Sequence, residues 1–315
     1  MAEMTRPTVP AKLPSLVKAA FDKARLSGDL TYYPTQVAVL APNSIPFQLR
    51  FSPALASKPK APKPKEPNGK PFNPFESPLP AMLIADFPPS HRLVLNKFAV
   101  VPEHFLLVTK EVKPQTHVLE IDDIAATFAC IQAYRVEGQE LFAFFNSGPN
   151  SGASQPHRHL QLLPVQSMRD GLENVNQGND WSVLADRLSE SGNALPFQVF
   201  TTSMRPNMTA EERHSAYLSL YRCAVKAVFP QSEARSEEAE ISYNFTMTSQ
   251  SMALCPRMAE GTMIKDKFGK DIGVVSLNGT VLAGTALVKN EAEWNALRED
   301  PNMLLGVLKG IGLPS

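Results

Sequence analysis

The sequence predicts an α+β fold in which helices pack against an antiparallel sheet. Short segments with the alternation of strands outnumber segments with helical spacing. Two of the extended segments, residues 93–96 and 105–109, are joined by a turn, which favours antiparallel pairing. Two long segments, residues 121–136 and 209–229, carry apolar residues at helical spacing and need a surface to pack against. We expect one catalytic domain over residues 1–315.

The composition is that of an ordinary globular chain without a dominant charge. The 315 residues are 43% hydrophobic, and 31 basic side chains balance 31 acidic ones, so nothing indicates a nucleic-acid partner or an acidic membrane surface. The three cysteines are scattered and lack the spacing of metal ligands, which suits a reducing compartment. Residues 1–12 lack the apolar core of a secretory signal, and no segment approaches the ~20 apolar residues of a membrane span. We expect a cytoplasmic protein, with nuclear access left open.

The first part of the chain alternates between ordered elements and one unusual loop. Residues 13–27 have helical spacing and end at Gly28, a good helix stop. Residues 30–40 and 45–51 are predicted strands, the second with the alternation of a half-buried strand. Residues 53–80 contain a run of prolines and lysines that cannot pack, so we expect a mobile, extended loop.

The remaining elements follow from the same patterns. Residues 81–85, 92–96 and 105–109 are predicted strands, with His91 and His104 expected to be structural or surface residues. The turn between the last two strands passes through residues 102–104. The predicted elements that follow are a helix at 121–136, a strand at 140–145, a helix at 180–191, a strand at 196–202, a helix at 209–229 capped by Thr209, paired strands at 242–248 and 252–257, a polar solvated connection at 258–272, extended segments at 274–277 and 284–288, and a helical end at 290–315.

Residues 146–164 hold the densest group of chemically useful side chains. A loop rich in Gly, Ser and Asn leads into an alternating segment in which His157, His159 and Gln161 would share one face of a strand. Arg158 and Leu160 would face the other way. A loop with many free backbone N–H groups can bind phosphate oxygens, and an imidazole can attack phosphorus. A metal pair or two half-exposed histidines on a sheet edge are the alternatives, although zinc would need further ligands.

The pattern His-x-His-x-Gln at residues 157–161 resembles the nucleotidyltransferase branch of the histidine-triad superfamily. With Asn146, Gly148 and residues 151–154, the segment resembles the fungal diadenosine tetraphosphate phosphorylases, also called ATP adenylyltransferases. Two further blocks support the resemblance, at residues 91–109 and 276–289. It covers about residues 50–289 and implies a histidine-triad-like antiparallel sheet flanked by helices.

The resemblance also implies a reaction. Diadenosine tetraphosphate and inorganic phosphate would be converted reversibly into ATP and ADP through an adenylyl-histidine. His159 would be the nucleophile, His157 would shape the pocket, and Gln161 would donate to a phosphate oxygen where the hydrolase branch has its third histidine. No cofactor would be required, although a divalent cation such as magnesium could stimulate the reaction. The substrates are small molecules, and we expect a monomer.

The residues that would hold the substrate are carried over from the same resemblance. Thr285 departs from it, because the family has a methionine there. Lys58 is the best match for a phosphate-binding lysine, and Lys60 competes with it because the Pro/Lys repeat makes the register slip. The substrate-binding residues implied by the resemblance are Lys58, Asn96, Lys97, Asn146, Gly152, Ala153, Ser154, Gln155, Asn278, Gly279, Thr280, Thr285 and Lys289.

Three other functions remain open at this stage. A hexose-1-phosphate uridylyltransferase uses a similar His-x-His-x-Gln segment but usually carries metal ligands that we do not find here. A dinucleoside polyphosphate hydrolase would need a histidine in place of Gln161. A non-catalytic dinucleotide-binding protein would keep the pocket and lose the nucleophile, whereas His159 is intact. Phosphate dependence, base preference and a covalent intermediate would separate the four functions.

Overall fold

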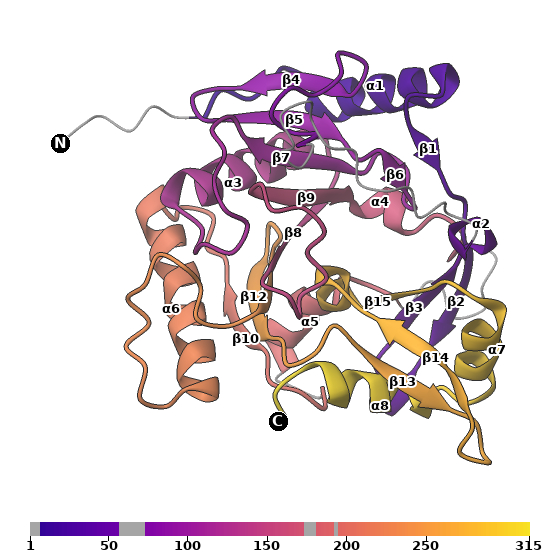
Figure 1. The fold of residues 1–315 in the computed structure, drawn as a ribbon. Helices are drawn as coiled ribbons and strands as arrows, with labels where there is room; N and C mark the ends of the chain where they lie inside the picture. The colour runs from indigo at the N-terminus through magenta and orange to yellow at the C-terminus, as the bar shows by residue number, and fades with distance from the viewer. Residues whose placement is uncertain (1–6, 57–72, 173–180, 192–194) are drawn as a thin grey trace, which may run out of the picture.

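A computed structural model describes residues 7–56, 73–172, 181–191 and 195–315. Its centre is an eight-stranded sheet in the order β10-β12-β11-β8-β9-β7-β5-β4, in which every neighbouring pair is antiparallel. The predicted antiparallel sheet flanked by helices is therefore confirmed (Figure 1). The strands are β4 (Leu83–Phe87), β5 (His91–Leu95), β7 (Phe105–Thr109), β8 (Leu141–Ser147), β9 (His159–Pro164), β10 (Phe200–Ser203), β11 (Tyr243–Met247) and β12 (Ser251–Pro256).

One face of this sheet is covered by α3 (Ile121–Val136) and α6 (Ala210–Val228), with α1 (Leu13–Ser27) beside them over β4 and β5. The predicted end of α1 and the predicted start of α6 are confirmed. Gly28 ends α1 at a φ of 79°, a conformation that glycine adopts without strain. Thr209 caps α6 in a reciprocal pair with Glu212, which satisfies two backbone N–H groups at the start of the helix.

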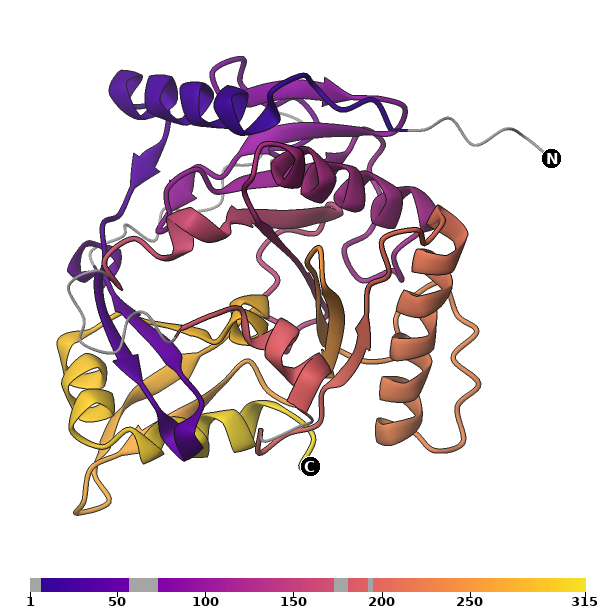
Figure 2. The same ribbon diagram turned by 180° about the vertical axis from the view of Figure 1, so that it is seen from behind.

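The other face carries a second layer made from residues 36–51 and 261–311, as the rear view in Figure 2 shows. Its core packs apolar side chains of the second layer against Phe142, Phe144 and Leu163 of the large sheet. Its elements are β2 (Gln36–Leu40), β3 (Phe47–Phe51), β13 (Gly261–Lys265), β14 (Asp271–Ser276), the 3-10 helix η4 (Gly279–Ala283), β15 (Thr285–Val288), α7 (Glu291–Glu299) and α8 (Asn302–Ile311). Smaller elements are β1 (Thr31–Tyr32), η1 (Pro42–Ser44), α2 (Pro53–Ala56), β6 (Phe98–Ala99), α4 (Val165–Met168) and α5 (Leu184–Ser191).

Three local predictions are wrong. Residues 258–272 are not an irregular connection, because β13 and β14 form a hairpin there and α8 packs on β13, although the tip of the hairpin is exposed as predicted. Pairing is not antiparallel throughout, because β15 lies parallel to β3 and β1 lies parallel to β6. The strand at residues 47–51 is buried on both faces, because the polar ends of Gln48 and Arg50 find hydrogen-bond partners inside the protein.

The predicted Pro/Lys loop falls largely on residues 57–72, outside the described residues. Its first residues form the short helix α2, and its end, from residue 73, returns toward β9. Within the described part of the chain, no helix combines the length and apolar character needed to cross a membrane.

Candidate active site

The two central strands of the sheet, β8 and β9, separate at the candidate site. They pair from Leu141 and Pro164 up to Phe144 and Gln161. Beyond that point the side-chain amide of Gln115 lies between them, donating to the carbonyls of Asn146 (2.9 Å) and His159 (3.1 Å) and accepting from His159 N–H (2.8 Å). Because Gln115 satisfies the backbone groups that the separated strands expose, the ladder can open here without leaving them unpaired.

His159 is a buried reactive group at this opening. Its side chain is 4% exposed, and Nδ1 lies 2.8 Å from the backbone carbonyl of His157. Since a carbonyl can only accept, Nδ1 carries the proton and Nε2 keeps a free lone pair. Burial lowers the pKa of His159 to about 4, so the ring is neutral at pH 7. The arrangement supplies the carbonyl that a nucleophilic imidazole needs to fix its tautomer.

His157 is held on both ring nitrogens by protein groups. Asn73 Nδ2 donates to Nδ1 at 2.9 Å, so Nε2 carries the proton and donates to the carbonyl of Thr109 at 2.9 Å. Phe75 packs against both histidines, with its ring centre 5.0 Å from that of His159. The ring of His157 thus fixes the backbone that carries the carbonyl facing His159.

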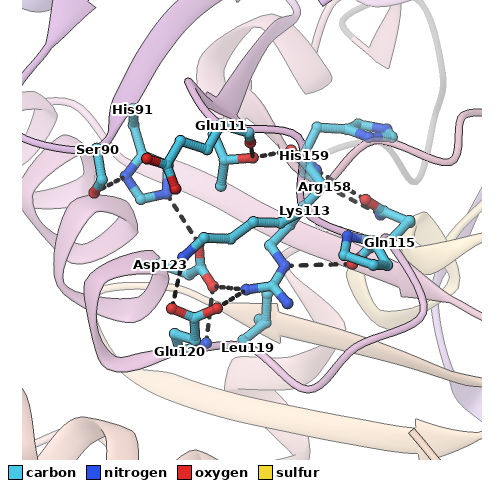
Figure 3. A network of polar contacts seen from close by, with 12 residues as sticks. Ser90, His91, Glu111, Lys113, Gln115, Leu119, Glu120, Asp123, Arg158 and His159 are labelled. Atoms are coloured by element: carbon cyan, nitrogen blue, oxygen red, sulfur yellow. Dashed lines mark hydrogen bonds and ion pairs between the residues drawn. The ribbon is translucent and has the colours of Figure 1, made fainter. Parts of the chain in front are cut away.

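The intervening residue, Arg158, points into a buried ionic network (Figure 3). Its Nη1 donates to Asp123 at 2.9 Å and to Glu120 at 2.8 Å, and Asp123 also accepts from His91 Nε2 at 2.9 Å. Burial alone would raise the pKa of Asp123, but the hydrogen bond from His91 and the charge of Arg158 outweigh it and lower that pKa. His91 is a buried structural residue, which is one of the two roles predicted for it.

A cavity of about 250 Å³ opens between the large sheet and the second layer, on the face of β9 that Gln161 occupies. It brings together residues from β3, β8, β9, the turn before β7 and the η4–β15 segment. Four further polar residues line it and were not predicted to bind substrate, namely Arg50, His104, Glu260 and Ser276. The predicted residues that line it are Gly152, Gln161, Asn278, Thr280, Thr285 and Lys289.

Two glycines allow the loops beside this cavity to meet. A Cβ on Gly279 would lie 2.6 Å from the Phe144 ring and 2.8 Å from Asn146 Oδ1, which accepts from Gly279 N–H at 2.9 Å. Gly152 has a φ of +79°, and its Cβ would lie 2.8 Å from that of Asn278. Asn146 is 1% exposed, and its Nδ2 has no hydrogen-bond partner among the described residues. A buried donor of this kind is a ready contact for a ligand oxygen.

Several predicted residues do not line this cavity, among them His157, His159, Asn146 and Gly279. Asn96 directs its side chain to His104 and to the backbone N–H of Phe98, and Lys97 is exposed. Ala153 and Ser154 are exposed on the loop after Gly152, and Gln155 is half-buried there. Lys58 and its competitor Lys60 lie outside the described residues. Contact of these residues with a substrate stays a prediction.

The two most notable residues that sequence reasoning missed are buried. Arg50 is 2% exposed and donates to the carbonyls of Met168 (2.5 Å) and Asp170 (3.1 Å), which ties the chain after β9 to β3; burial lowers its pKa to about 10. His104 is 6% exposed. The pairing of Leu106 with Gln161 places His104, two residues earlier, on the Gln161 face. The alternation of side chains along a strand would have placed His104 on the Gln161 face, but only once the pairing of β7 with β9 was known.

The family model for the Ap4A phosphorylase N-terminal domain matches residues 3–175, more than half of the chain. The chain belongs to the Ap4A phosphorylase family. A second model, for the ATP adenylyltransferase C-terminal domain, matches residues 193–314. Strands from both regions share the large sheet, since β8 pairs with β11.

Two yeast relatives match this member of the Ap4A phosphorylase family over most of its length. Protein APA1 of Saccharomyces cerevisiae is 27% identical over 98% of this chain and 96% of its own. The diadenosine 5',5'''-P1,P4-tetraphosphate phosphorylase 2 of the same yeast is 28% identical over 85% of this chain and 84% of its own. The crystal structure of yeast Ap4A phosphorylase Apa2 in complex with AMP superposes with a TM-score of 0.78, covering 98% of each chain at 23% identity, so the fold is shared.

Proposed function

We propose that this chain phosphorolyses diadenosine tetraphosphate to ATP and ADP through an adenylyl group carried on His159. The observation that carries the proposal is the state of His159, a neutral imidazole whose Nδ1 proton is held by the His157 carbonyl and whose Nε2 is free. The family assignment supports the reaction class, and the solved structure of yeast Apa2 in complex with Ap4A supports a dinucleotide as the substrate class.

The reaction has two displacements at the same phosphorus. In the first, the Nε2 lone pair of His159 forms a P–N bond to the α-phosphorus of one adenosine, and the P–O bond to the bridging oxygen breaks, releasing ATP. In the second, an oxygen of inorganic phosphate forms a new P–O bond, the P–N bond breaks, and ADP leaves with His159 neutral again. Neutrality of the free ring favours both steps, because a protonated imidazole has no nucleophilic lone pair, and because the phosphorylated ring, a cation that keeps its Nδ1 proton, departs in the second step as neutral imidazole.

Gln161 suits a reaction whose leaving group is a polyphosphate. A terminal phosphate with a pKa near 6 departs as an anion without receiving a proton, so a general acid is not needed. An amide N–H can instead donate a hydrogen bond to a nonbridging oxygen as negative charge builds up there. Gln161 lines the cavity beside His104 and Leu163, in reach of this role.

The remaining polar groups would hold the nucleotide and its phosphates. Thr285 places a buried hydroxyl, without a partner among the described residues, in the wall where the family has a methionine. Asn146 offers its Nδ2, and Lys289 brings a positive charge to the rim. We expect a stimulatory magnesium ion to bind chiefly to the polyphosphate, because Mg²⁺ in such sites keeps several waters and is bound by substrate phosphates together with one or two carboxylates.

The test is product analysis with diadenosine tetraphosphate, with and without inorganic phosphate. The proposal predicts ATP and ADP only when phosphate is present, and no turnover in His159→Ala. ATP and AMP formed without phosphate would make the chain a hydrolase. Binding without turnover in the wild type would make it a nucleotide-binding protein, and turnover of uridine but not adenine nucleotides would favour a uridylyltransferase.

A further inference from the structure

His104 is a buried histidine in the cavity wall whose role the mechanism above does not use. It directly precedes β7, and the β7–β9 register puts it on the same face of the sheet as Gln161 and Leu163. Its side chain is 6% exposed, and it lines the cavity together with Gln161. An ionisable group in this position needs a reason beyond packing, because burying a polar ring costs free energy unless it is hydrogen-bonded.

The hydrogen bonds around His104 determine which ring nitrogen carries its proton. The backbone N–H of Phe98 donates to Asn96 Oδ1 at 3.3 Å, which fixes the orientation of the Asn96 amide. Asn96 Nδ2 therefore donates to His104 Nδ1 at 2.8 Å. Since Nδ1 accepts, the proton of the neutral ring is on Nε2. Burial lowers the pKa of His104 to about 3, so the ring stays neutral at physiological pH.

The resulting donor, Nε2–H, lies against the side chain of Gln161. It has no hydrogen bond of regular geometry with any described residue, although Gln161 is its polar neighbour in the cavity wall. The amide of glutamine offers one acceptor, Oε1, and one donor group, Nε2. A fixed donor beside this amide therefore selects between its two orientations.

We propose that His104 is a positioning residue that donates its Nε2–H to Gln161 Oε1 and so turns the Gln161 amide N–H toward the phosphate. The inference rests on the proposed function, in which Gln161 donates to a phosphate oxygen. With the opposite orientation, Gln161 would present an oxygen to the phosphate and repel it. The chain of bonds runs from Phe98 N–H through Asn96, His104 and Gln161 to the substrate.

Three substitutions separate donation from space-filling. His104→Gln keeps a donor at the position of Nε2, whereas His104→Asn keeps one only at the position of Nδ1, and His104→Phe keeps the ring shape without either. We expect kcat to fall about 10-fold or more in His104→Phe and His104→Asn, with KM changed far less, and to be largely restored in His104→Gln. His214→Phe is the matched control, because His214 lies on α6 and contacts the Leu119 carbonyl on the other side of the sheet.

A double-mutant cycle decides whether His104 acts through Gln161. We expect His104→Phe to have little further effect on kcat in a Gln161→Ala background, because the group that it orients is gone. Additive losses in the cycle, or equal loss in His104→Gln and His104→Phe with unchanged thermal unfolding, would overturn the inference. Failure of the proposed function would look different from failure of this inference, because the wild-type protein itself would then form no ATP and ADP in the presence of phosphate.

Discussion

The buried polar groups on the two sides of the segment at residues 157–161 differ in whether they have partners. On the face toward α3, Arg158 is 1% exposed and its charge is matched by Asp123 and Glu120. On the face toward the cavity, polar atoms of His104 and Thr285 are buried without regular partners among the described residues. Complete pairing fixes a backbone, whereas unpaired donors are ready to meet a ligand.

The comparison shows how one short segment serves both purposes. Because neighbouring residues of an extended segment point in opposite directions, Arg158 can anchor the chain while His159 stays available for chemistry. The anchored backbone includes the carbonyl of His157, which determines the tautomer of His159. A rigid face thus supports a reactive one, and each prediction below disturbs one face and asks whether the other responds.

The largest effect is expected on the reactive face. His159→Ala and His159→Gly remove the atom that bonds to phosphorus, so kcat should fall by about 10⁴-fold or more. The anchored face is untouched, so the protein should stay folded in the assay, and the thermal unfolding midpoint should fall only by what the emptied side-chain volume costs. Steady-state product formation and calorimetry measure the two quantities, and residual activity within 10-fold of the wild type would exclude His159 as the nucleophile.

The next effect concerns the anchored face. Asp123→Ala leaves Arg158 buried with Glu120 alone, and we expect a loss of about 3–5 kcal/mol in the free energy of unfolding. Glu120→Ala is the matched control, because Glu120 bonds to the same guanidinium but its side chain is 49% exposed, so the loss should be about 1 kcal/mol or less. Urea unfolding measures both losses, and equal losses would contradict the claim that the buried carboxylate of Asp123 stabilises Arg158 more than the exposed one of Glu120 does.

A smaller effect is expected where the two faces meet. Gln115→Leu leaves the carbonyls of Asn146 and His159 without their donor, which should cost about 2–3 kcal/mol of stability and also lower kcat, since His159 loses its backbone support. Gln139→Leu, at an exposed position, is the control. Normal kcat in a destabilised Gln115→Leu variant would show that the opening of the strands does not position His159.

The smallest effect is a pH dependence. His159 has a folded pKa of about 4, below the ordinary 6.5, so in acid it gains a proton more readily in the unfolded chain. Its contribution to stability is therefore present above pH 6.5 and is lost as the pH falls toward 4, by about 1–2 kcal/mol between pH 7 and 5. Wild type should lose that much more than His159→Ala in urea unfolding over this range, and identical losses would mean that His159 is not held neutral.

The sequence predicts the parts of this architecture that depend on local patterns. Helices α1, α3 and α6 follow from apolar spacing, and the sequence also predicts that α1 ends at Gly28 and that α6 begins after Thr209. The alternation at residues 157–161 correctly separates Arg158 from His159 and Gln161. These features need only neighbours along the chain, and local pattern is enough for them.

The features that could not be predicted depend on contacts between distant segments. The parallel pairing of β15 with β3 joins residues more than 230 positions apart, and no local signal encodes it. Gln115 lies far in sequence from the strands that it bridges, and Asn73 is 84 residues from the histidine that it contacts. His104 resembles any turn histidine until the partner of β7 is known.

The covalent intermediate tests the central claim most directly. The protein would be incubated with diadenosine tetraphosphate in the absence of inorganic phosphate, digested under conditions that preserve a phosphoramidate, and analysed by mass spectrometry. We predict one adenylyl group on the peptide that contains His159, released as ADP when phosphate is added. An enzyme that turns over without any adduct, or that carries the adenylyl group on another residue, would contradict the account.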